Sequence, residues 1–324
     1  MAAFVLRRLL QGIIVVALVA TIVFLLIHVP PGAPFADAMD NPNVTAAVRE
    51  SWLEDYGLNR PLAEQYARYV ANVFRGEFGF SFSKQRPVLD ALASALPNTL
   101  LLMALGLAGG FALGIGVAVA QVRNRGRLLD KLLGGISLTF LAVPDFWLAL
   151  LVAVSLSSWV HLFPTGGMVS VAEYDYLGPA GRVADRLKHL VLPALTLSLL
   201  YFPIIARHQR AALIDVLPAG YITTARAKGV DESTVVRHHA MRNALLPVIT
   251  ILGVAFPALL TGAVFIEKVF AWPGMGLLIV SSIDSRDYPL LTAAVILGAA
   301  FVVVGSLIAD TLYRWLDPRL RDER

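Results

Sequence analysis

The sequence of 324 residues contains little charge and no cysteine. Asp, Glu, Lys and Arg make up 15% of the chain, whereas a typical soluble domain contains about 25%. This deficit argues against an ordinary soluble enzyme, and the hydrophobic share of 57% excludes a disordered chain. The absence of cysteine excludes disulfides, thiol nucleophiles and zinc–thiolate sites.

Motifs for nucleotide binding and for hydrolytic chemistry are also missing. No G-x-x-x-x-G-K-[ST] phosphate loop occurs, and the nearest stretch, Gly262 to Lys268, lacks the second glycine and the hydroxyl residue. The six histidines form no H-E-x-x-H pair, and no nucleophile-elbow pattern is present. The sequence therefore predicts no catalytic residues, no metal site and no cofactor bound by this chain. A membrane enzyme is an alternative that would need a reactive site of another kind.

Long uncharged hydrophobic runs are the main feature that is present. The mean hydropathy is +0.69, and a membrane-spanning helix needs about 20 apolar residues. Six stretches meet or approach this length: Leu9–Ile27, Leu100–Ala120, Leu132–Val160, Leu190–Ala206, Leu245–Ile266 and Leu290–Ala309. Five contain no charged residue, and the third contains only Asp145. The first is too long for a signal-peptide core and lacks a small-residue cleavage site, so we expect a retained helix.

Basic residues predict the orientation of these six helices. With the N-terminus inside, the cytoplasmic segments hold 16 Lys and Arg, and the two shorter external loops hold 5. Short cytoplasmic loops are enriched in these residues, whereas long loops cross regardless of charge. The predicted fold is therefore an all-α polytopic membrane protein with six transmembrane helices and both termini in the cytoplasm. Gly106, Gly110 and Gly114 allow another helix to approach closely, which we interpret as general intramembrane packing.

The segments between the runs suggest three parts. Residues 1–30 form the first transmembrane helix, residues 31–96 an external helical loop, and residues 97–324 a five-helix core with a cytoplasmic segment, 207–244. In the external loop, apolar spacing predicts helices over Val44–Tyr56 and Leu62–Phe74 and a short helix after Pro87. This loop either contacts an external partner or folds over the bundle, and its spacing does not decide between them.

The cytoplasmic segment 207–244 has a helix–turn–helix pattern. A helix is predicted from Arg207 to Lys228, followed by a left-handed turn at Gly229. Asp231 or Ser233 can cap a second, basic helix that runs to about residue 243. Such a segment either lies on anionic lipid headgroups or docks to a cytoplasmic protein, and spacing alone modestly favours the headgroups.

Several segments, in their order along the chain, resemble a known family. The cytoplasmic ones are Tyr221-Ile222-Thr223-Thr224-Ala225-Arg226-Ala227-Lys228-Gly229 and Arg242-Asn243-Ala244-Leu245-Leu246-Pro247. The others are Asp55-Tyr56-Gly57-Leu58-Asn59-Arg60-Pro61, Arg75-Gly76-Glu77-Phe78-Gly79, Val143-Pro144-Asp145-Phe146-Trp147, Leu192-Pro193-Ala194-Leu195-Thr196-Leu197, Phe270-Ala271-Trp272-Pro273-Gly274-Met275-Gly276, Arg286-Asp287-Tyr288-Pro289 and Leu316-Asp317-Pro318-Arg319. Together they resemble the permeases of ABC importers, most of all the dipeptide/oligopeptide/nickel branch.

The sequence departs from the pattern of that family at two places. Thr223-Thr224-Ala225 stands where the general importer motif begins Glu-Ala-Ala. Gly220 stands where the peptide branch usually has an acidic residue, and a glycine there loosens the helix by about 1 kcal/mol relative to alanine.

The resemblance implies a function and a set of partners. The glycine-turn segment would be the coupling helix, which sits in a groove of an ATP-hydrolysing subunit and contacts it through Ala225, Lys228, Gly229, Val230 and Asp231. The partners would be a second homologous permease chain, two ATP-binding subunits and an extracytoplasmic solute-binding protein, in a prokaryotic inner membrane and without nucleic acid. The partner subunits would hydrolyse ATP, and this chain would import dipeptides or oligopeptides by alternating access.

Asp145 and the other acidic residues near the spans bear on the transport mechanism. Asp145 either lines the translocation cavity and meets the cationic amino end of a peptide, or caps the helix that restarts at Phe146, and we favour capping. A proton relay usually needs several intramembrane ionisable groups, and the sequence offers one carboxylate. An ion-coupled secondary transporter is therefore kept as the alternative to an ATP-driven importer. Solvated or helix-capping charges are expected at four positions: Glu267, Asp284, Asp287 and Asp310.

Overall fold

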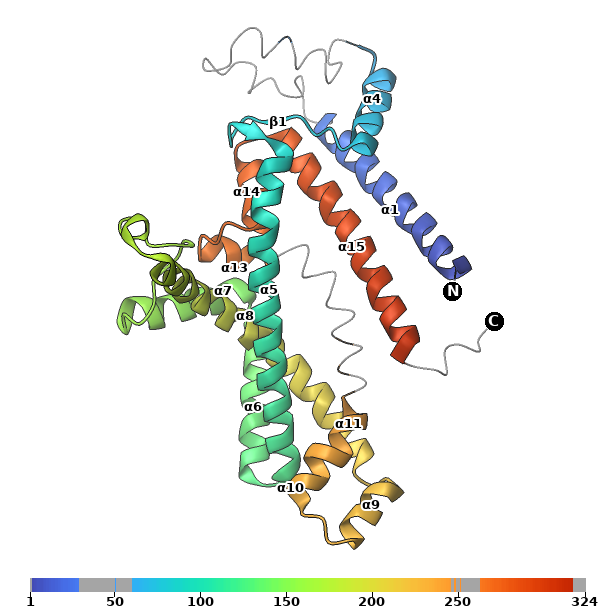
Figure 1. Cartoon of the computed structure of the whole chain (residues 1–324), viewed down its shortest axis with the longest axis vertical. Coiled ribbons are helices and arrows are strands. Elements are labelled where there is room, and N and C mark those ends of the chain that lie inside the picture. Colours follow the sequence, from blue (N-terminus) through green and yellow to red (C-terminus); the bar gives the residue numbers. More distant parts are fainter. Residues whose placement is uncertain are drawn as a thin grey trace.

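The computed structural model describes residues 2–28, 60–245 and 263–316, together with Glu50, Val248 and Ile251. Its elements are α1 (Ala2–His28), α4 (Leu62–Arg75), β1 (Phe80–Ser81), β2 (Arg86–Pro87), α5 (Val88–Arg123), α6 (Leu128–Ala142), α7 (Asp145–Ala153), η1 (Val154–Trp159), η2 (Tyr174–Tyr176), α8 (Pro179–Val216), α9 (Gly220–Ala227), α10 (Glu232–Thr234), η3 (Val235–Ala240), α11 (Met241–Ala244), α13 (Val264–Val269), α14 (Met275–Asp284) and α15 (Tyr288–Leu316). The described chain is thus mostly helical, with one short antiparallel hairpin of β1 and β2 (Figure 1).

Four helices, α1, α5, α8 and α15, are long and apolar enough to cross a membrane. A fifth candidate is the pair formed by α6 and the helix that continues from α7 into η1. Five of the six predicted stretches therefore fall on these helices. The predicted span Leu245–Ile266 lies mostly outside the described residues. The predicted all-α, multi-pass class is confirmed at this level of detail.

The third predicted span is not one continuous helix. α6 ends at Ala142 and α7 begins at Asp145, and the two halves meet at an angle of 107°. Val143, with φ −79° and ψ 129°, is extended, because the ring of Pro144 disfavours helical geometry in the preceding residue. The expected restart of the helix after Pro144 is confirmed, although α7 begins at Asp145 rather than at Phe146.

The α5–α8 pair forms the centre of the molecule, and small residues let its two helices approach closely (Figure 1). A Cβ added at Gly106 would lie 2.5 Å from Cβ of Leu197, and one added at Gly114 would lie 2.7 Å from Cβ of Ile205. The interpretation of this glycine stripe as intramembrane packing is confirmed. The short helix predicted after Pro87 is the start of α5 itself, which runs unbroken for 36 residues.

Helix α4 folds against α1, which in turn packs along α15 (Figure 1). The hydroxyl of Tyr69 donates to the backbone oxygen of Ala20 at 3.1 Å, and the hydroxyls of Tyr66 and Thr21 lie 2.7 Å apart. The predicted helix over Leu62–Phe74 is confirmed, and it lies over the bundle. The predicted helix over residues 44–56 falls outside the described residues, except for Glu50.

Glu267 is fully buried and holds the start of α14. Its carboxylate accepts from the hydroxyl of Thr99 on α5 at 2.8 Å and from the backbone N–H of Leu277 at 2.9 Å. Of the two interpretations made from the sequence, capping is confirmed for this residue and solvation is wrong. Asp284, at the end of α14, is exposed as a solvated charge would be.

Asp287 is also fully buried, and it caps α15. One carboxylate oxygen accepts from the backbone N–H of Leu290 at 3.2 Å, and the other accepts from the hydroxyl of Ser81 at 2.6 Å and the N–H of Ser83 at 2.9 Å. The capping interpretation is confirmed here, whereas solvation is wrong. The side chain of Asp310 lies outside the described residues.

Candidate functional site

Segment 207–244, which was predicted to be cytoplasmic, contains a compact projection, residues 220–244, which we call the knob. It comprises α9, α10, η3 and α11 and lies at one end of the molecule, below the α5–α8 pair in Figure 1. The predicted helix from Arg207 to Lys228 is interrupted, because α8 ends at Val216 and α9 begins at Gly220. Pro218 lies in the break and has no N–H to continue the helical hydrogen bonds. The prediction of one continuous helix is therefore wrong.

The turn at the tip of the knob has the predicted geometry. Gly229 has φ +78°, in the left-handed region, and a Cβ added there would meet no atom within 4 Å. The glycine is therefore required for its backbone conformation rather than for space. Asp231 is the N-cap of the next helix, and its carboxylate accepts from the backbone N–H of Thr234 at 2.9 Å. Hydrogen bonding to the side chain of Thr234, together with this backbone hydrogen bond, lowers the pKa of Asp231 below its usual value.

Apolar side chains anchor the knob to the stem helices α8 and α5. The buried members of this cluster are Val122, Ala212, Leu213, Ile222, Ala225, Val235, Val236, Ala240 and Ala244. They come from α5, α8 and three elements of the knob, so a single core joins the knob to the transmembrane helices. A displacement of the knob therefore moves α8 with it, because close-packed cores deform little.

Polar contacts clamp the two arms of the knob together. Arg226 of α9 donates from Nε and Nη2 to the two carboxylate oxygens of Glu232 of α10, at 3.0 and 2.7 Å. The amide of Asn243 donates to the hydroxyl of Tyr221 at 2.7 Å. The side-chain hydrogen bond from Arg226 lowers the pKa of Glu232, so the carboxylate stays ionised. The pair spans the turn at Gly229 and fixes its shape.

Sequence reasoning missed these clamps and the wide turn of η3. Arg226 and Glu232 lie on opposite sides of a helix break, where helical spacing rules do not apply. η3 is a π-helix of six residues, Val235–Ala240, and such insertions are frequent at functional positions. The only signal in the sequence was the resemblance, whose motifs include Tyr221, Arg226 and Asn243.

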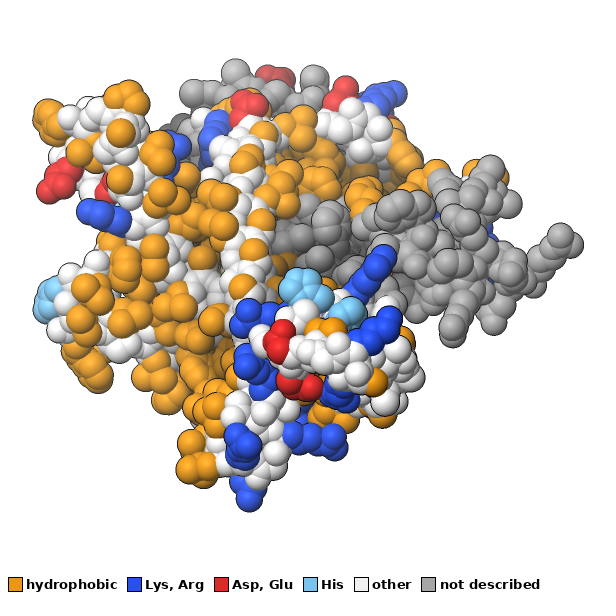
Figure 2. Space-filling model, turned by 60° about the horizontal axis from the view of Figure 1, so that its bottom comes forward, with side chains coloured by type: hydrophobic (Ala, Val, Ile, Leu, Met, Phe, Trp, Pro, Cys, Tyr) orange, Lys and Arg blue, Asp and Glu red, His pale blue; other side chains and the backbone are white. Residues whose placement is uncertain are grey.

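The five residues that the resemblance singled out occupy two environments. Ala225 is buried in the core of the knob, whereas Lys228, Gly229 and Asp231 are exposed at its tip and Val230 is half-buried beside them. Four exposed basic side chains extend this surface: Arg237, His238, His239 and Arg242. Lys and Arg side chains gather over this end of the molecule, whereas hydrophobic side chains dominate the surface beyond it (Figure 2). The end has the electrostatics of a cytoplasmic membrane face.

Asp145 lies in the first turn of α7 and lines a cavity of about 420 Å³. The cavity is bounded by α6, α7, α8 and the start of α13, and its other walls are almost entirely apolar, with Tyr201 as a second polar group. The side chain of Asp145 is exposed rather than packed away. Asp145 is the first residue of α7, the N-cap is Pro144, and no side-chain capping hydrogen bond is present there, so the favoured N-cap role is wrong. The carboxylate can still complement the dipole of α7 or line a substrate path.

A second cavity, of about 520 Å³, continues along the same groove between α6 and α8. Leu141 lines both cavities. The second cavity is lined by the basic residues Lys131, Arg207 and Arg210 and by the small residues Gly134 and Ser137. The groove thus joins the apolar region around Asp145 to the basic end of the molecule. Among the described residues, no group of three or more His, Asp or Glu is arranged to hold a metal ion.

These features define a multi-pass helical membrane protein with a projecting basic knob and a groove beside a broken helix. Residues 110–322 match the family of binding-protein-dependent transport system inner membrane components, and residues 1–103 match the N-terminal component of the same systems. The chain belongs to this family and is the permease subunit of an ABC importer. Such a system includes an ATPase and a solute-binding protein. The ion-coupled alternative is not favoured.

Similar proteins match the chain over its whole length. An oligopeptide transport system permease protein of Bacillus subtilis (strain 168), AppB, is 39% identical over 321 residues, which is 99% of each chain. The glutathione transport system permease protein GsiC of Escherichia coli (strain K12) is 36% identical over 321 residues, again 99% of each chain.

Proposed function

We propose that this chain imports short peptides across a prokaryotic inner membrane, as one of two homologous permeases in an assembly with two ATP-binding subunits and an external solute-binding protein. The proposal includes six membrane-spanning helices with both termini in the cytoplasm, and the parts 1–30, 31–96 and 97–324. The names of the two relatives, which specify oligopeptide and glutathione transport, support a peptide substrate. The gathering of basic residues around the knob supports a cytoplasmic position for that end.

The knob is the proposed docking element for the ATPase. Lys228, Gly229, Val230 and Asp231 would contact the ATPase groove, and Ala225 would support them from inside. The observation that carries this proposal is the rigid construction of the tip: a left-handed glycine turn closed by the Arg226–Glu232 pair and packed on the stem core. A lever must be rigid to transmit motion, and an amphipathic helix that merely rests on lipid has no need of such clamps.

The groove between α6 and α8 is the proposed path for the solute. Asp145 would stand at its apolar end, where a carboxylate attracts the cationic amino end of a peptide. ATP would be bound and hydrolysed by the partner subunits only, since the sequence contains no phosphate loop. In this scheme closure of the ATPase pair moves the knobs, the permeases rock, and the cavity alternates between the two sides.

Replacement of Gly229 by valine tests the docking role. A β-branched residue at φ +78° costs roughly 1–2 kcal/mol or more, so we expect the tip to distort while the membrane helices still insert. Affinity purification of the membrane assembly should then recover fewer ATPase subunits, and ATP-dependent uptake should fall at least about tenfold.

Gly220→Ala provides the matched control. Gly220 is the first residue of α9, with no left-handed backbone and no atom within 4 Å of an added Cβ. Alanine there should leave uptake unchanged or slightly raised, since it favours the helix by up to about 1 kcal/mol. Full recovery of the ATPase subunits and normal uptake with Gly229→Val would refute the docking role.

A further inference from the structure

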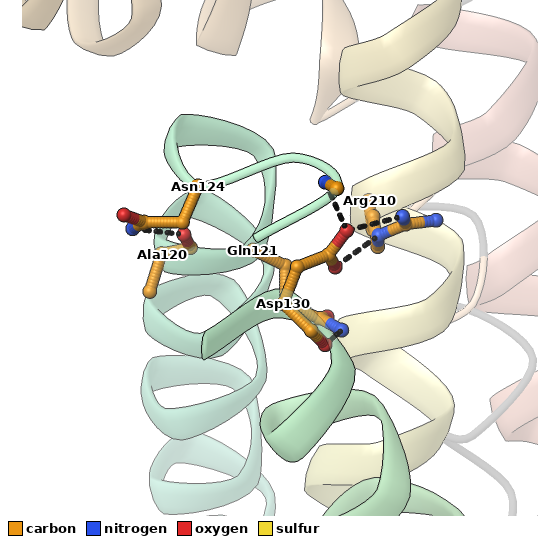
Figure 3. Close-up of polar contacts among 6 residues, drawn as sticks. Ala120, Gln121, Asn124, Asp130 and Arg210 are labelled. Carbon is orange, nitrogen blue, oxygen red and sulfur yellow. Dashed lines mark hydrogen bonds and ion pairs between the residues drawn. The ribbon is translucent and has the colours of Figure 1, made fainter. Parts of the chain in front are cut away.

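An ion pair between a buried carboxylate and a half-buried guanidinium joins the start of α6 to the stem of the knob. The carboxylate of Asp130 accepts from Nε of Arg210 at 3.2 Å and from Nη2 at 3.1 Å (Figure 3). One of the same oxygens also accepts from the backbone N–H of Gly126 at 3.1 Å. Asp130 is 8% exposed, so the pair is largely withdrawn from water on the carboxylate side. A bidentate contact between arginine and a carboxylate fixes both the separation and the orientation of the two side chains.

The pair lies where three helical elements meet. Asp130 is in the first turn of α6, and Arg210 is in the last third of α8. The side-chain amide of Gln121, on α5, donates to the backbone oxygen of Asp130 at 3.4 Å (Figure 3). Asn124 closes the end of α5 by donating to the backbone oxygen of Ala120 at 2.8 Å. The turn between α5 and α6 is therefore held against α8 at this point.

On the knob side, Arg210 is flanked by residues that the knob contacts. Leu213, three residues further along α8, is completely buried in the core shared with the knob. Gln209, immediately before Arg210, is also completely buried and approaches the sulfur of Met241 at 3.4 Å. A displacement of the knob is therefore delivered to α8 in the turn that carries Arg210.

On the groove side, Asp130 is the only buried residue among the fifteen residues of α6. The other side chains of α6 are partly or fully exposed. After the bend at Pro144 the chain continues into α7, whose first residue is Asp145. Gly134, Ser137, Leu138 and Leu141 of α6 line the groove. Among the residues that the structure describes, the ion pair thus attaches the stem of the knob directly to the helix that borders the groove.

We propose that Asp130 and Arg210 form a transmission link, which carries the displacement of the knob to α6 and so changes access to the groove. Asp130 and Arg210 also line the second cavity. We assign them as positioning residues, because their charged groups bind each other and act through α6. This inference rests on the proposed docking role of the knob. The competing account is that the pair only stabilises the fold, and the two accounts differ in what happens when the pair is broken in an assembled transporter.

The test uses a reporter on the groove rather than an assumed peptide. The chain has no cysteine, so Leu138→Cys introduces one thiol on α6 at a position that is 63% exposed in the groove. The complete assembly, with its ATPase subunits and binding protein, is reconstituted in liposomes. The rate at which a water-soluble maleimide labels this chain is then measured without nucleotide and with ATP plus vanadate, alongside the rate of ATP hydrolysis.

We expect ATP to change the labelling rate in the reporter background. With Asp130→Asn or Arg210→Gln, that change should shrink by about fivefold or more, the low end of typical coupling between sites, while the ATPase subunits still co-purify and hydrolyse ATP. The double variant should be no worse than either single variant, because both remove one shared interaction. Arg123→Gln is the matched control, because Arg123 is an exposed cation at the end of α5 and makes none of these contacts. In this variant ATP should change the labelling rate as much as it does in the Leu138→Cys background alone.

Several results would overturn the link. One is an unaltered ATP-dependent change in Asp130→Asn and Arg210→Gln, and another is strictly additive losses in the double variant. If these variants fail to assemble, Arg210→Lys is used to distinguish a transmission role from a stabilising role. Lysine keeps the positive charge but cannot make the two parallel hydrogen bonds of arginine. A normal change in Arg210→Lys, or failure of that variant to assemble as well, would leave only a stabilising role. Gly229→Val in the same background separates the two proposals: a normal change there would refute the docking role, whatever the Asp130 variants show.

Discussion

At the scale of single residues, the polar side chains fall into two groups with different surroundings. Glu267 and Asp287 are completely buried, and each accepts from a backbone N–H at the start of a helix and from a hydroxyl group. Asp145 and Lys228 are exposed, one on the groove and one on the knob. Burial with matched donors indicates a role in holding the fold, whereas an exposed charge on a functional surface is available to a ligand or partner.

Asp145→Asn tests whether this carboxylate meets the solute. If it contacts the amino end of a peptide, loss of the charge should lower uptake of tri-alanine by about tenfold, because a contact between charged groups contributes about 1.5 kcal/mol. Uptake of tri-alanine acetylated at its amino end should change much less. Asp284→Asn, at an exposed carboxylate on α14, is the control. Equal uptake of both peptides before and after the substitution at Asp145 would reject the role and leave only the interaction with the dipole of α7.

Glu267→Gln tests the buried cap of α14. Glutamine can accept from Thr99 or from the N–H of Leu277, but its own N–H₂ group then faces the other donor. We expect a loss of about 1–3 kcal/mol of stability, seen as a lower melting temperature of the detergent-purified chain. Glu173→Gln, at an exposed position, should leave the melting temperature unchanged. A Glu267→Gln variant as stable as the wild type would contradict the capping account.

At the scale of helices, the close contact of α5 and α8 keeps the centre of the molecule rigid. Gly114 gives a direct test of this contact, because a Cβ there would lie 2.7 Å from Cβ of Ile205 and also 2.9 Å from the backbone oxygen of Phe202. A backbone atom cannot move aside as the end of a side chain can. The α5–α8 pair thus provides a fixed frame on which the knob and α6 are mounted.

Gly114→Ala should therefore separate the two helices. We expect overpacking to cost about 1–3 kcal/mol, which exceeds the gain of up to about 1 kcal/mol in helix propensity. Thermal unfolding in detergent measures the difference. Gly116→Ala is the matched control on the same helix, since nothing lies within 4 Å of its added Cβ, and it should be neutral or slightly stabilising. Equal melting temperatures for the two variants would show that α5 and α8 are not in firm contact.

Hydrophobic runs were enough to predict most helices, and turn chemistry was enough to predict the turn at Gly229 and the cap at Asp231. Both signals are local, and they act through backbone geometry and burial. The restart of the helix after Pro144 was expected. The break at Pro218 was not predicted, because prolines are tolerated within membrane helices such as α8, which contains Pro193 and Pro203. The same residue type is therefore accommodated within one helix and ends another, and the tertiary surroundings decide.

Contacts between distant segments could not be predicted from one sequence. The partnership of Asp130 with Arg210 joins residues 80 positions apart, and that of Glu267 with Thr99 joins residues 168 positions apart. Periodicity assigns a residue to a face of a helix, but it does not specify which other helix meets that face. The resemblance located the knob without revealing that Ala225 faces inward or that Arg226 and Glu232 close the turn.

At the scale of the whole molecule, the structure has the parts of a lever. The knob lies at one end, the α5–α8 pair forms the stem, and the groove with Asp145 lies beside the bent α6–α7 helix (Figure 1). The chain belongs to a family of ABC importer permeases, whose systems include a separate ATPase, and we propose that this partner supplies the force. This arrangement accounts for a permease that carries the path for the solute and receives its energy through the knob.

Reconstitution with and without the ATPase subunits tests this account most directly. Liposomes containing this chain, its homologous permease and the binding protein should take up peptide only when the ATPase subunits and ATP are both present. An imposed proton gradient should not replace them, since the described part of the groove offers one carboxylate at its apolar end and no relay. Full-rate uptake by the permeases alone, driven by a proton or sodium gradient, would contradict the account.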